Sequence, residues 1–366
     1  MIKNITIRNY KSIRDLTLPL GRVNVLIGEN GAGKSNFISF FEMVHALYHQ
    51  RLGHYSLVHG GGYRFLYEGE YGDPYVEGSI DFDHEVAFFF RLVPSVSNKL
   101  LIEESRILTG YLGGEDHDRL KHWQENIMVD SSVEESALLR FRHGSNADEI
   151  LQQHMADFTV FHFHDTGITA AMRRPSPLRD NDRLRSDGSN LAGFLFMLQE
   201  KYPDTLEMIE GVTRSIAPYF GRFKLTPDRL TPDTVTLKWE EEGSSCYLDG
   251  YSFSDGTLRF IALATLLLQP RLPATIFIDE PELGLHPVAI NLLGSLISRA
   301  SLDSQIILAT QSATLLNCFE PDEVITVDRR DRQSVFRRLN GEELVHWLQE
   351  YSLGDIWTKN IIGGQI

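Results

Sequence analysis

Residues 22–49 read "RVNVLIGENGAGKSNFISFFEMVHALYH" and hold the strongest structural signal in the chain. The β-branched residues that lead to Gly28 predict a buried strand. After the loop, apolar side chains recur at helical spacing. The segment between them fits the pattern G-x-x-x-x-G-K-[ST], which ends in Gly33, Lys34 and Ser35. Strand, glycine-rich loop and helix in this order predict a phosphate-binding loop in an α/β protein.

The residue types of this loop suit a nucleoside triphosphate and its metal ion. Glycines allow the backbone to curl so that its N–H groups point at phosphate oxygens, and the following helix adds its positive end. Lys34 can reach the β- and γ-phosphates, and the Ser35 hydroxyl can ligate Mg²⁺. We therefore expect ATP and Mg²⁺ as ligands, with these nucleotide-binding residues: Asn30, Gly31, Gly33, Lys34, Ser35 and Asn36. The alternative, a glycine-rich turn with an unrelated lysine, is disfavoured because the pattern stands between a strand and a helix.

Two acids end a predicted apolar strand in "ATIFIDEPELGLHP", residues 274–287. Opposite a phosphate loop, Asp279 can hold Mg²⁺ through water, and Glu280 can act as the general base for the attacking water. A pair of solvated acids is the alternative, and the phosphate loop upstream favours the functional interpretation. Gln311 follows another predicted strand in "SQIILATQSATLL". Parallel strands carry their functional loops at their carboxyl ends, so Gly28, Asp279 and Gln311 are expected at one edge of a sheet.

A Ser-Asp-Gly triplet stands before an apolar helix in "YSFSDGTLRFIALATLLL", residues 251–268. Ser254 or Asp255 can serve as an ordinary helix cap. The same turn can bind an anion, because Ser254 offers a hydroxyl, Gly256 exposes a backbone N–H and the helix supplies its positive end. Taken alone, the turn favours the cap.

In chain order, the phosphate loop, "FSDGT", "IFIDEPELGLHP" and "ATQS" resemble an ABC-type ATPase. They look most like the branch that contains SMC, RecF and the small stand-alone RecF-like AAA/ABC ATPases of bacteria, and "IRNYKSI" resembles the start of that branch. The similarity covers about residues 1–50 and 245–330, and the tail "YSLGDIWTKN" adds to it. It implies a P-loop NTPase of α/β class, an ABC-type head with an antiparallel β subdomain and an inserted helical lobe.

The resemblance also implies how the residues work together. ATP would hold two copies head to tail as a homodimer, with two ATP–Mg²⁺ between them. Ser254 and Gly256 would contact the γ-phosphate in trans, on the nucleotide of the other subunit. The catalytic residues would be Glu280 and Gln311, and the metal ligands would be Ser35 and Asp279.

Two positions depart from the pattern of the family. Asp255 stands where many signature turns have glycine, and we expect its charge to be turned away or paired, with Arg259 one turn on as the candidate partner. Gln311 stands where many ABC ATPases have a switch histidine. An amide can hydrogen-bond to phosphate or position water but carries no charge, so we expect slow hydrolysis that depends weakly on pH.

Residues 51–244 differ in character from the segments on either side. Predicted strands separated by Gly, Pro, Asp and Asn are followed by helices, and "SALLRFRHG" is expected to add a strand. We expect 1–50 and 245–366 to form a discontinuous nucleotide-binding core, with 51–244 as an inserted β-rich and helical lobe. Sustained heptads are absent from the sequence between phosphate loop and signature turn, which argues against a long coiled coil.

Several polar clusters in the chain have less specific interpretations. His162, His164 and Asp165 in "FHFHD" can present two imidazoles on one strand face, but zinc needs further ligands that the sequence does not reveal. We expect these histidines to be structural or close to phosphate. Arginines at 173–185 and 329–338 form two basic segments, for which a solvated segment is favoured over contacts with DNA phosphates or an acidic partner.

Composition limits the classes of partner. The formal net charge of −15 argues against binding nucleic acid over the whole surface and leaves room for a local basic patch. Two cysteines far apart fit a reducing cytoplasm. The opening residues alternate like a strand and do not resemble a signal peptide. No apolar run reaches the length of a membrane span, so no membrane partner is expected.

Three functions remain open at this point. The first is an ATP-driven molecular switch that acts on DNA or on a nuclease-type partner, in genome maintenance or anti-phage defence, as the resemblance implies. The second is the ATP-binding subunit of a membrane transporter, disfavoured by the large insertion and by Gln311. The third is a nucleotide sensor or scaffold without hydrolysis, disfavoured by Glu280.

Overall fold

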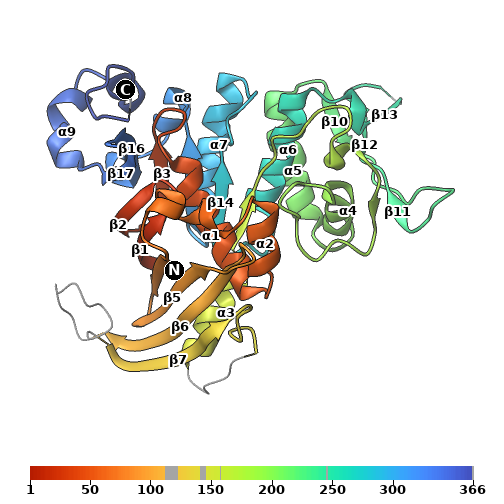
Figure 1. Cartoon of the computed structure of the whole chain (residues 1–366). Coiled ribbons are helices and arrows are strands. Elements are labelled where there is room, and N and C mark those ends of the chain that lie inside the picture. The colour runs from red at the N-terminus through yellow and green to blue at the C-terminus, as the bar shows by residue number, and fades with distance from the viewer. Residues whose placement is uncertain (112–122, 141–145, 157, 245, 365–366) are drawn as a thin grey trace.

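A computed structural model of the 366-residue chain describes residues 1–111, 123–140, 146–156, 158–244 and 246–364. Within these ranges the backbone forms two six-stranded sheets, two small sheets and the helices that pack on them (Figure 1). Both cysteines are free thiols. Among the described helices, none combines the length and the apolarity that crossing a membrane requires.

The first sheet carries the predicted phosphate loop and has the strand order β17-β16-β3-β15-β14-β8. Its strands are β3 (Val23–Ile27), β8 (Thr159–Phe161), β14 (Thr275–Asp279), β15 (Gln305–Thr310), β16 (Val324–Arg330) and β17 (Gln333–Arg338). All neighbours are parallel except β17, which pairs antiparallel with β16. The ends of β3, β14 and β15 therefore meet at one edge, which confirms the arrangement expected for Gly28, Asp279 and Gln311.

Side chains of this sheet alternate between two hydrophobic cores, as the strand period of two requires. On β14, Ile276 and Ile278 face one core while Phe277 faces the other. Phe277 meets helix α1 (Lys34–Tyr48) through Phe41, with ring centroids 4.3 Å apart. Because Phe40 of the same helix stacks on Phe90 in the second sheet, α1 is enclosed between the two six-stranded sheets. Packing on both faces of the helix fixes the loop that precedes it.

The second sheet is antiparallel throughout and has the order β2-β1-β4-β5-β6-β7. Its strands are β1 (Ile2–Tyr10), β2 (Ile13–Pro19), β4 (Val76–Phe82), β5 (Val86–Pro94), β6 (Leu100–Tyr111) and β7 (Trp123–Val133). The strand predicted in "SALLRFRHG" is wrong for residues 136–140, and residues 141–144 lie outside the described part. There the Asp130 carboxylate accepts hydrogen bonds from the Ser136 hydroxyl and the Ala137 N–H, which turns the chain.

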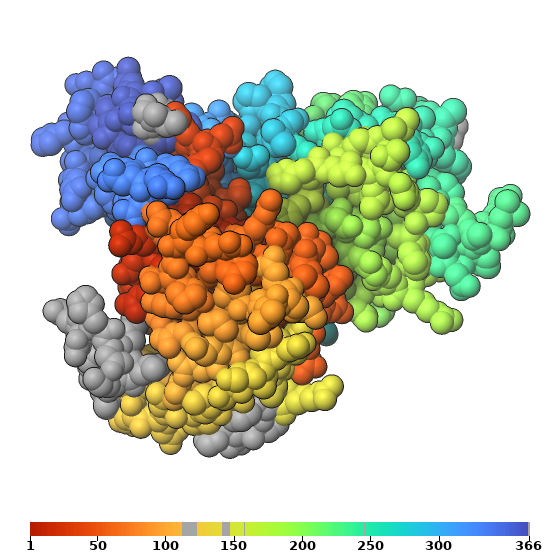
Figure 2. All heavy atoms as spheres, viewed as in Figure 1, coloured from red at the N-terminus to blue at the C-terminus, as the bar shows by residue number. Residues whose placement is uncertain are grey.

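Helices cover the other face of the parallel sheet. The long ones are α4 (Leu191–Lys201), α5 (Pro203–Ile216), α6 (Asp255–Leu268) and α7 (Pro287–Ala300). Small strands beside them are β9 (Ser176–Pro177), β10 (Phe220–Phe223), β11 (Thr234–Val235), β12 (Lys238–Glu241) and β13 (Tyr247–Asp249). The shorter helices are α2 (Leu52–Val58), α3 (Asn146–Met155), α8 (Ala313–Leu316), α9 (Gly341–Leu348) and α10 (Leu353–Thr358). Figure 2 shows the green part of the chain, which carries α4, α5 and β10 to β13, on the side away from the blue C-terminal residues; these lie beside red N-terminal residues.

The division expected at residues 50 and 244 stays a prediction. The segment 51–244 gives strands β4 to β7 to the antiparallel sheet, and its strand β8 pairs in parallel with β14. Through β8 this segment adds a parallel strand to the sheet that carries the phosphate loop.

Candidate functional site

The phosphate loop adopts the curled backbone that its glycines permit. Gly31 and Gly33 have φ values of +81° and +116°, which side chains other than glycine rarely adopt. A Cβ atom at Gly33 would lie 2.0 Å from the Ser334 hydroxyl oxygen of β17. The neighbouring Asn36 amide donates to the Ser12 hydroxyl at 2.7 Å. Two far-apart segments thus hold the loop and the first turn of α1.

Lys34 lies inside this loop. Its Nζ donates hydrogen bonds to the carbonyl oxygens of Gly28 (2.6 Å) and Glu29 (3.0 Å). Burial lowers the pKa of the ammonium group, and the negative charges of Glu280 and Asp279 oppose that shift. The ammonium group thus lies at the phosphate loop, bound to backbone carbonyl oxygens, and a lysine at this place can reach the phosphates of a triphosphate.

Ser35 and Asp279 bring oxygen ligands to the same place. Burial, then the charge of Glu280, raises the pKa of the Asp279 carboxyl, and a hydrogen bond from Ser35 lowers it. Asp279 Oδ1 is buried and has no hydrogen-bond partner among the described residues. A divalent cation would reduce the repulsion between Asp279 and Glu280 and would give Asp279 Oδ1 a partner. Hydroxyl and carboxylate oxygens are ligands that suit Mg²⁺. The donor set therefore fits the metal expected from the sequence.

Gln311 links Glu280 to the phosphate loop. Its Nε2 donates to Asn30 Oδ1 at 2.7 Å and also to Glu280 Oε1. Glu280 itself has a φ of +44°, an uncommon left-handed backbone for a residue with a side chain, and its N–H bonds to Ala309 O at 2.8 Å. Strained conformations of this kind persist only where the surrounding structure enforces them, and they cluster at functional sites.

We expect Gln311→Ala to slow ATP hydrolysis at least about 10-fold, because the amide that positions Glu280 and Asn30 is lost. Gln311→His keeps a hydrogen-bond donor and should lose less. Phosphate release by both variants and the parent decides the role: unchanged rates in both would remove Gln311 from the mechanism.

Glu282 is a residue of the site that the sequence did not reveal. Its carboxylate accepts hydrogen bonds from the Thr310 hydroxyl (2.6 Å) and from the Gln311 N–H (3.0 Å). Burial raises its pKa. The side chain thus ties the loop after β14 to the loop after β15. Its place in "DEPE", two residues beyond Glu280, is the only signal for it.

The signature turn, residues 254–256, caps helix α6. In this turn Asp255 has a different partner from the one expected. Ser254 Oγ accepts from the Thr257 N–H at 3.1 Å and so caps α6. Asp255 pairs with Arg173 at 2.7 Å. Arg259 points elsewhere, because its guanidinium donates to the carbonyl oxygens of Phe163 and His164, both at 2.7 Å. The expectation that Arg259 compensates Asp255 is wrong.

Gly256 has a packing reason as well as a proposed binding role. A Cβ atom there would lie 2.5 Å from the carbonyl oxygen of Gly284, in the loop that follows β14. The signature turn therefore rests directly on the loop that carries the acids.

Arg173 supports the signature turn from a segment expected to be solvated. It is only 4% exposed. Besides Asp255, it donates to the carbonyl oxygens of Thr166 (2.8 Å), Phe253 (3.1 Å) and Gly250. For this arginine the solvated interpretation is wrong.

We expect Arg173→Ala to lower the free energy of unfolding by about 3 kcal/mol, since it leaves three carbonyl oxygens without a donor. Arg174→Ala is the matched control, because Arg174 is the exposed next residue. Urea unfolding followed by circular dichroism measures both. Equal stability of the two variants would contradict this role.

A pocket of ≈ 830 Å³ adjoins the phosphate loop on the side of the C-terminal tail. Asn30, Arg329 and Arg337 are among the residues that line it. Arg329 Nη1 donates to Gly31 O at 3.1 Å, and Glu29 N–H donates to Gly364 O at 3.0 Å. Its charged lining is mixed, with the arginines at 329, 330 and 337 and the acids Glu29 and Asp328.

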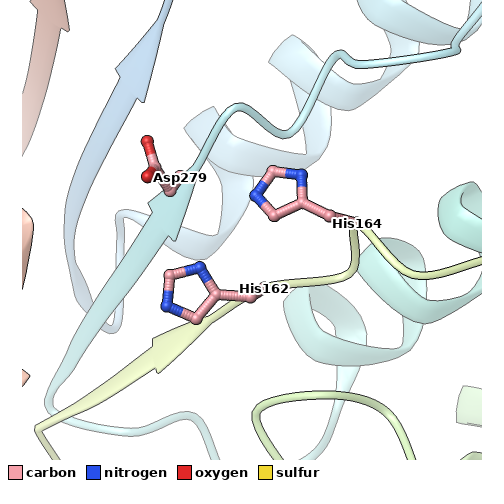
Figure 3. Close-up of side chains that lie close together, drawn as sticks. All are labelled: His162, His164 and Asp279. Atoms are coloured by element: carbon pink, nitrogen blue, oxygen red, sulfur yellow. The ribbon is translucent and has the colours of Figure 1, made fainter. Parts of the chain in front are cut away.

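His162 and His164 follow strand β8 and face Asp279 at the end of β14 (Figure 3). One ligand atom of each of the three side chains lies within 4.8 Å of the others. The group that the fold places beside the two histidines is thus an acid more than a hundred residues away in the chain.

Comparisons with known proteins give the family of the chain and its fold. A family model described as "AAA domain, putative AbiEii toxin, Type IV TA system" matches residues 112–317, and one described as "AAA ATPase domain" matches residues 1–56. No curated protein sequence matches the chain.

Two solved structures of SMC heads share the fold. A head bound to the C-winged helix domain of ScpA has a TM-score of 0.63 and 15% identity, covering 94% of this chain and 99% of that one. A head with an extended coiled coil, bound to the C-terminal domain of ScpA from Pyrococcus furiosus, has a TM-score of 0.58 and 14% identity, covering 95% and 98%. The expected ABC-type P-loop fold is confirmed.

Proposed function

Because the chain belongs to the family described as "AAA domain, putative AbiEii toxin, Type IV TA system", and is an ABC-type ATPase of the SMC/RecF branch, we propose that it hydrolyses ATP to switch a homodimer between closed and open states. The observation that carries this proposal is the convergence of Lys34, Asp279 and Glu280 at one edge of the parallel sheet, with Gln311 between the loop and the acids.

Each residue has a separate task in the proposed reaction. The loop N–H groups and Lys34 would bind the phosphates. Ser35 and Asp279 would hold Mg²⁺, which would supply positive charge beside the phosphate oxygens. Glu280 accepts the proton of the attacking water. Gln311 holds Glu280 in place with one N–H, and its other N–H would leave Asn30 to donate to the water or to the γ-phosphate. The strained backbone of Glu280 fixes this acid before ATP arrives.

The second half of each site comes from the other subunit in this proposal. Ser254 is exposed at the positive end of α6, where an anion is stabilised. Within the described chain, the turn 254–256 makes no hydrogen bond to the phosphate loop. Pairing of Arg173 with Asp255 reduces the negative charge that would repel a phosphate. Two head-to-tail copies would complete two sites by twofold symmetry.

Phosphate release measured over a range of protein concentrations tests this scheme. A rate per chain that rises with concentration, together with ATP-dependent dimers in light scattering, supports hydrolysis between two copies. Full activity from a strictly monomeric chain would overturn it.

The partner of the switch is proposed from the family resemblance. SMC heads of the solved structures bind ScpA domains, so a protein or DNA partner that senses closure is the expected output here. We favour DNA or a nuclease-type effector, in genome maintenance or anti-phage defence, in the cytoplasm. Affinity purification of the Glu280→Gln variant with ATP should retain that partner. Co-fractionation with a membrane permease would support the transporter alternative instead.

A further inference from the structure

The side chains of His162, His164 and Asp279 lie together in a cluster (Figure 3). The proposed hydrolysis uses Asp279 but gives no role to the two histidines. Their ligand atoms lie within 4.8 Å of one another, close enough for one ion to reach all three after small rotations. Asp279 Oδ1 is buried and has no hydrogen-bond partner in the described part of the chain. Burial of a carboxylate oxygen without a partner is costly, and a cation removes that cost.

A neighbouring side chain orients the ring of His162, and the backbone that carries His164 is held by hydrogen bonds. His162 Nε2 lies 2.9 Å from Glu42 Oε1 on α1, which leaves Nδ1 for a metal. Metal-bound histidines almost always use their second nitrogen to bond a carboxylate or carbonyl in this way. The backbone at His164 is fixed by Arg259, which donates to the carbonyl oxygens of Phe163 and His164.

The donor set is two imidazole nitrogens and one carboxylate oxygen. Mg²⁺ prefers oxygen ligands alone, whereas Zn²⁺, Co²⁺ and Fe²⁺ accept nitrogen. Two histidines and one carboxylate with open positions are typical of such ions. We propose that His162, His164 and Asp279 bind a divalent transition metal ion in the absence of nucleotide, with Zn²⁺ or Co²⁺ as suitable probes.

Asp279 connects this ion to the proposed ATPase site. An ion that takes Asp279 removes a ligand from Mg²⁺, so Zn²⁺ should inhibit hydrolysis. This consequence rests on the proposed function, but the binding itself does not. The two are therefore measured separately.

Cobalt titration of the metal-free full-length chain, without nucleotide, tests the binding. We expect visible d–d absorption bands that saturate at about one Co²⁺ per chain and that Zn²⁺ abolishes. His164→Ala and His162→Ala should each weaken binding at least about 10-fold, and Glu42→Gln should weaken it about 10-fold or more. Loss of the bands in the histidine variants, with an unchanged circular dichroism spectrum, supports the site.

His346→Ala is the matched control, because this histidine is exposed on α9. Lys34→Ala is the second control: it should lose ATP and keep the cobalt bands, so failure of the ATPase proposal would not mimic failure of the metal site. The proposal is overturned if the wild-type protein shows no cobalt absorption bands. It is also overturned if the bands persist unchanged in both His162→Ala and His164→Ala. Binding without Zn²⁺ inhibition of hydrolysis in an active enzyme would overturn the shared use of Asp279.

Discussion

Replacing Glu280 by glutamine should lower the rate of ATP hydrolysis by about 10²–10⁴-fold, the usual contribution of a general base. The substitution keeps the size and shape of the side chain, so Gln311 and Asn30 should stay in place. ATP binding should persist, because Lys34 and the loop are unchanged. The variant should therefore accumulate as an ATP-bound dimer, measured by single-turnover phosphate release and by light scattering.

The control for this substitution is Glu343→Gln, which makes the same chemical change at an exposed position of α9. It should hydrolyse ATP at the parent rate. If Glu280→Gln also retained that rate, the general base would lie elsewhere. Glu282 would be the next residue to test, since its carboxylate lies on the same loop and contacts Thr310.

The sequence predicted those parts of the site that a short stretch of chain specifies. The phosphate loop needs positive φ at Gly31 and Gly33 and a lysine at a fixed spacing, and all of this is local. Asp279 and Gln311 end strands, so one rule about parallel sheets was enough to bring them together. These features depend on spacing and on strand order, both of which can be inferred from the residues.

Partners that meet across the fold could not be inferred in the same way. Arg259 lies one turn from Asp255 and looked like its partner, but Arg173 takes that role from 82 residues away. Buried carbonyl oxygens of residues 163 and 164 need a donor, and the position of Arg259 in α6 supplies it. Such pairings are decided by which backbone groups are buried without water, which no local pattern reveals.

The same limit applies to the histidines. Two imidazoles were visible in "FHFHD", but the acid beside them was not, because the pairing of β8 with β14 is what brings Asp279 to this place. That pairing joins a segment assigned to the inserted lobe with a strand of the nucleotide core. The sequence changes in character near residue 51, yet the parallel sheet contains strands from both sides of that change.

Replacing Lys34 by alanine should weaken ATP binding by about 10²-fold, since a hydrogen bond to a charged group contributes roughly 1.5–3 kcal/mol. Hydrolysis at cellular ATP concentrations should then be lost. Ser254→Arg should also abolish hydrolysis, but for a different reason. This variant keeps Lys34, whereas its bulky arginine blocks the turn that completes the site of the other copy. Equilibrium binding of a fluorescent ATP analogue distinguishes the two defects, because only Lys34→Ala should bind it more weakly than the parent.

Mixing the two inactive variants tests whether the sites are shared between subunits. A mixed dimer pairs the intact phosphate loop of the Ser254→Arg copy with the intact turn of the Lys34→Ala copy, which restores one of two sites. With equal amounts and free exchange, about a quarter of the parental sites should return by twofold symmetry. The control is Ser295→Arg, which introduces the same side chain at an exposed position of α7 away from the turn. It shows whether an added arginine lowers activity wherever it is placed. If the mixture stays as inactive as its components while mixed dimers form, each chain completes its own site, because only sites built from two copies can regain activity on mixing.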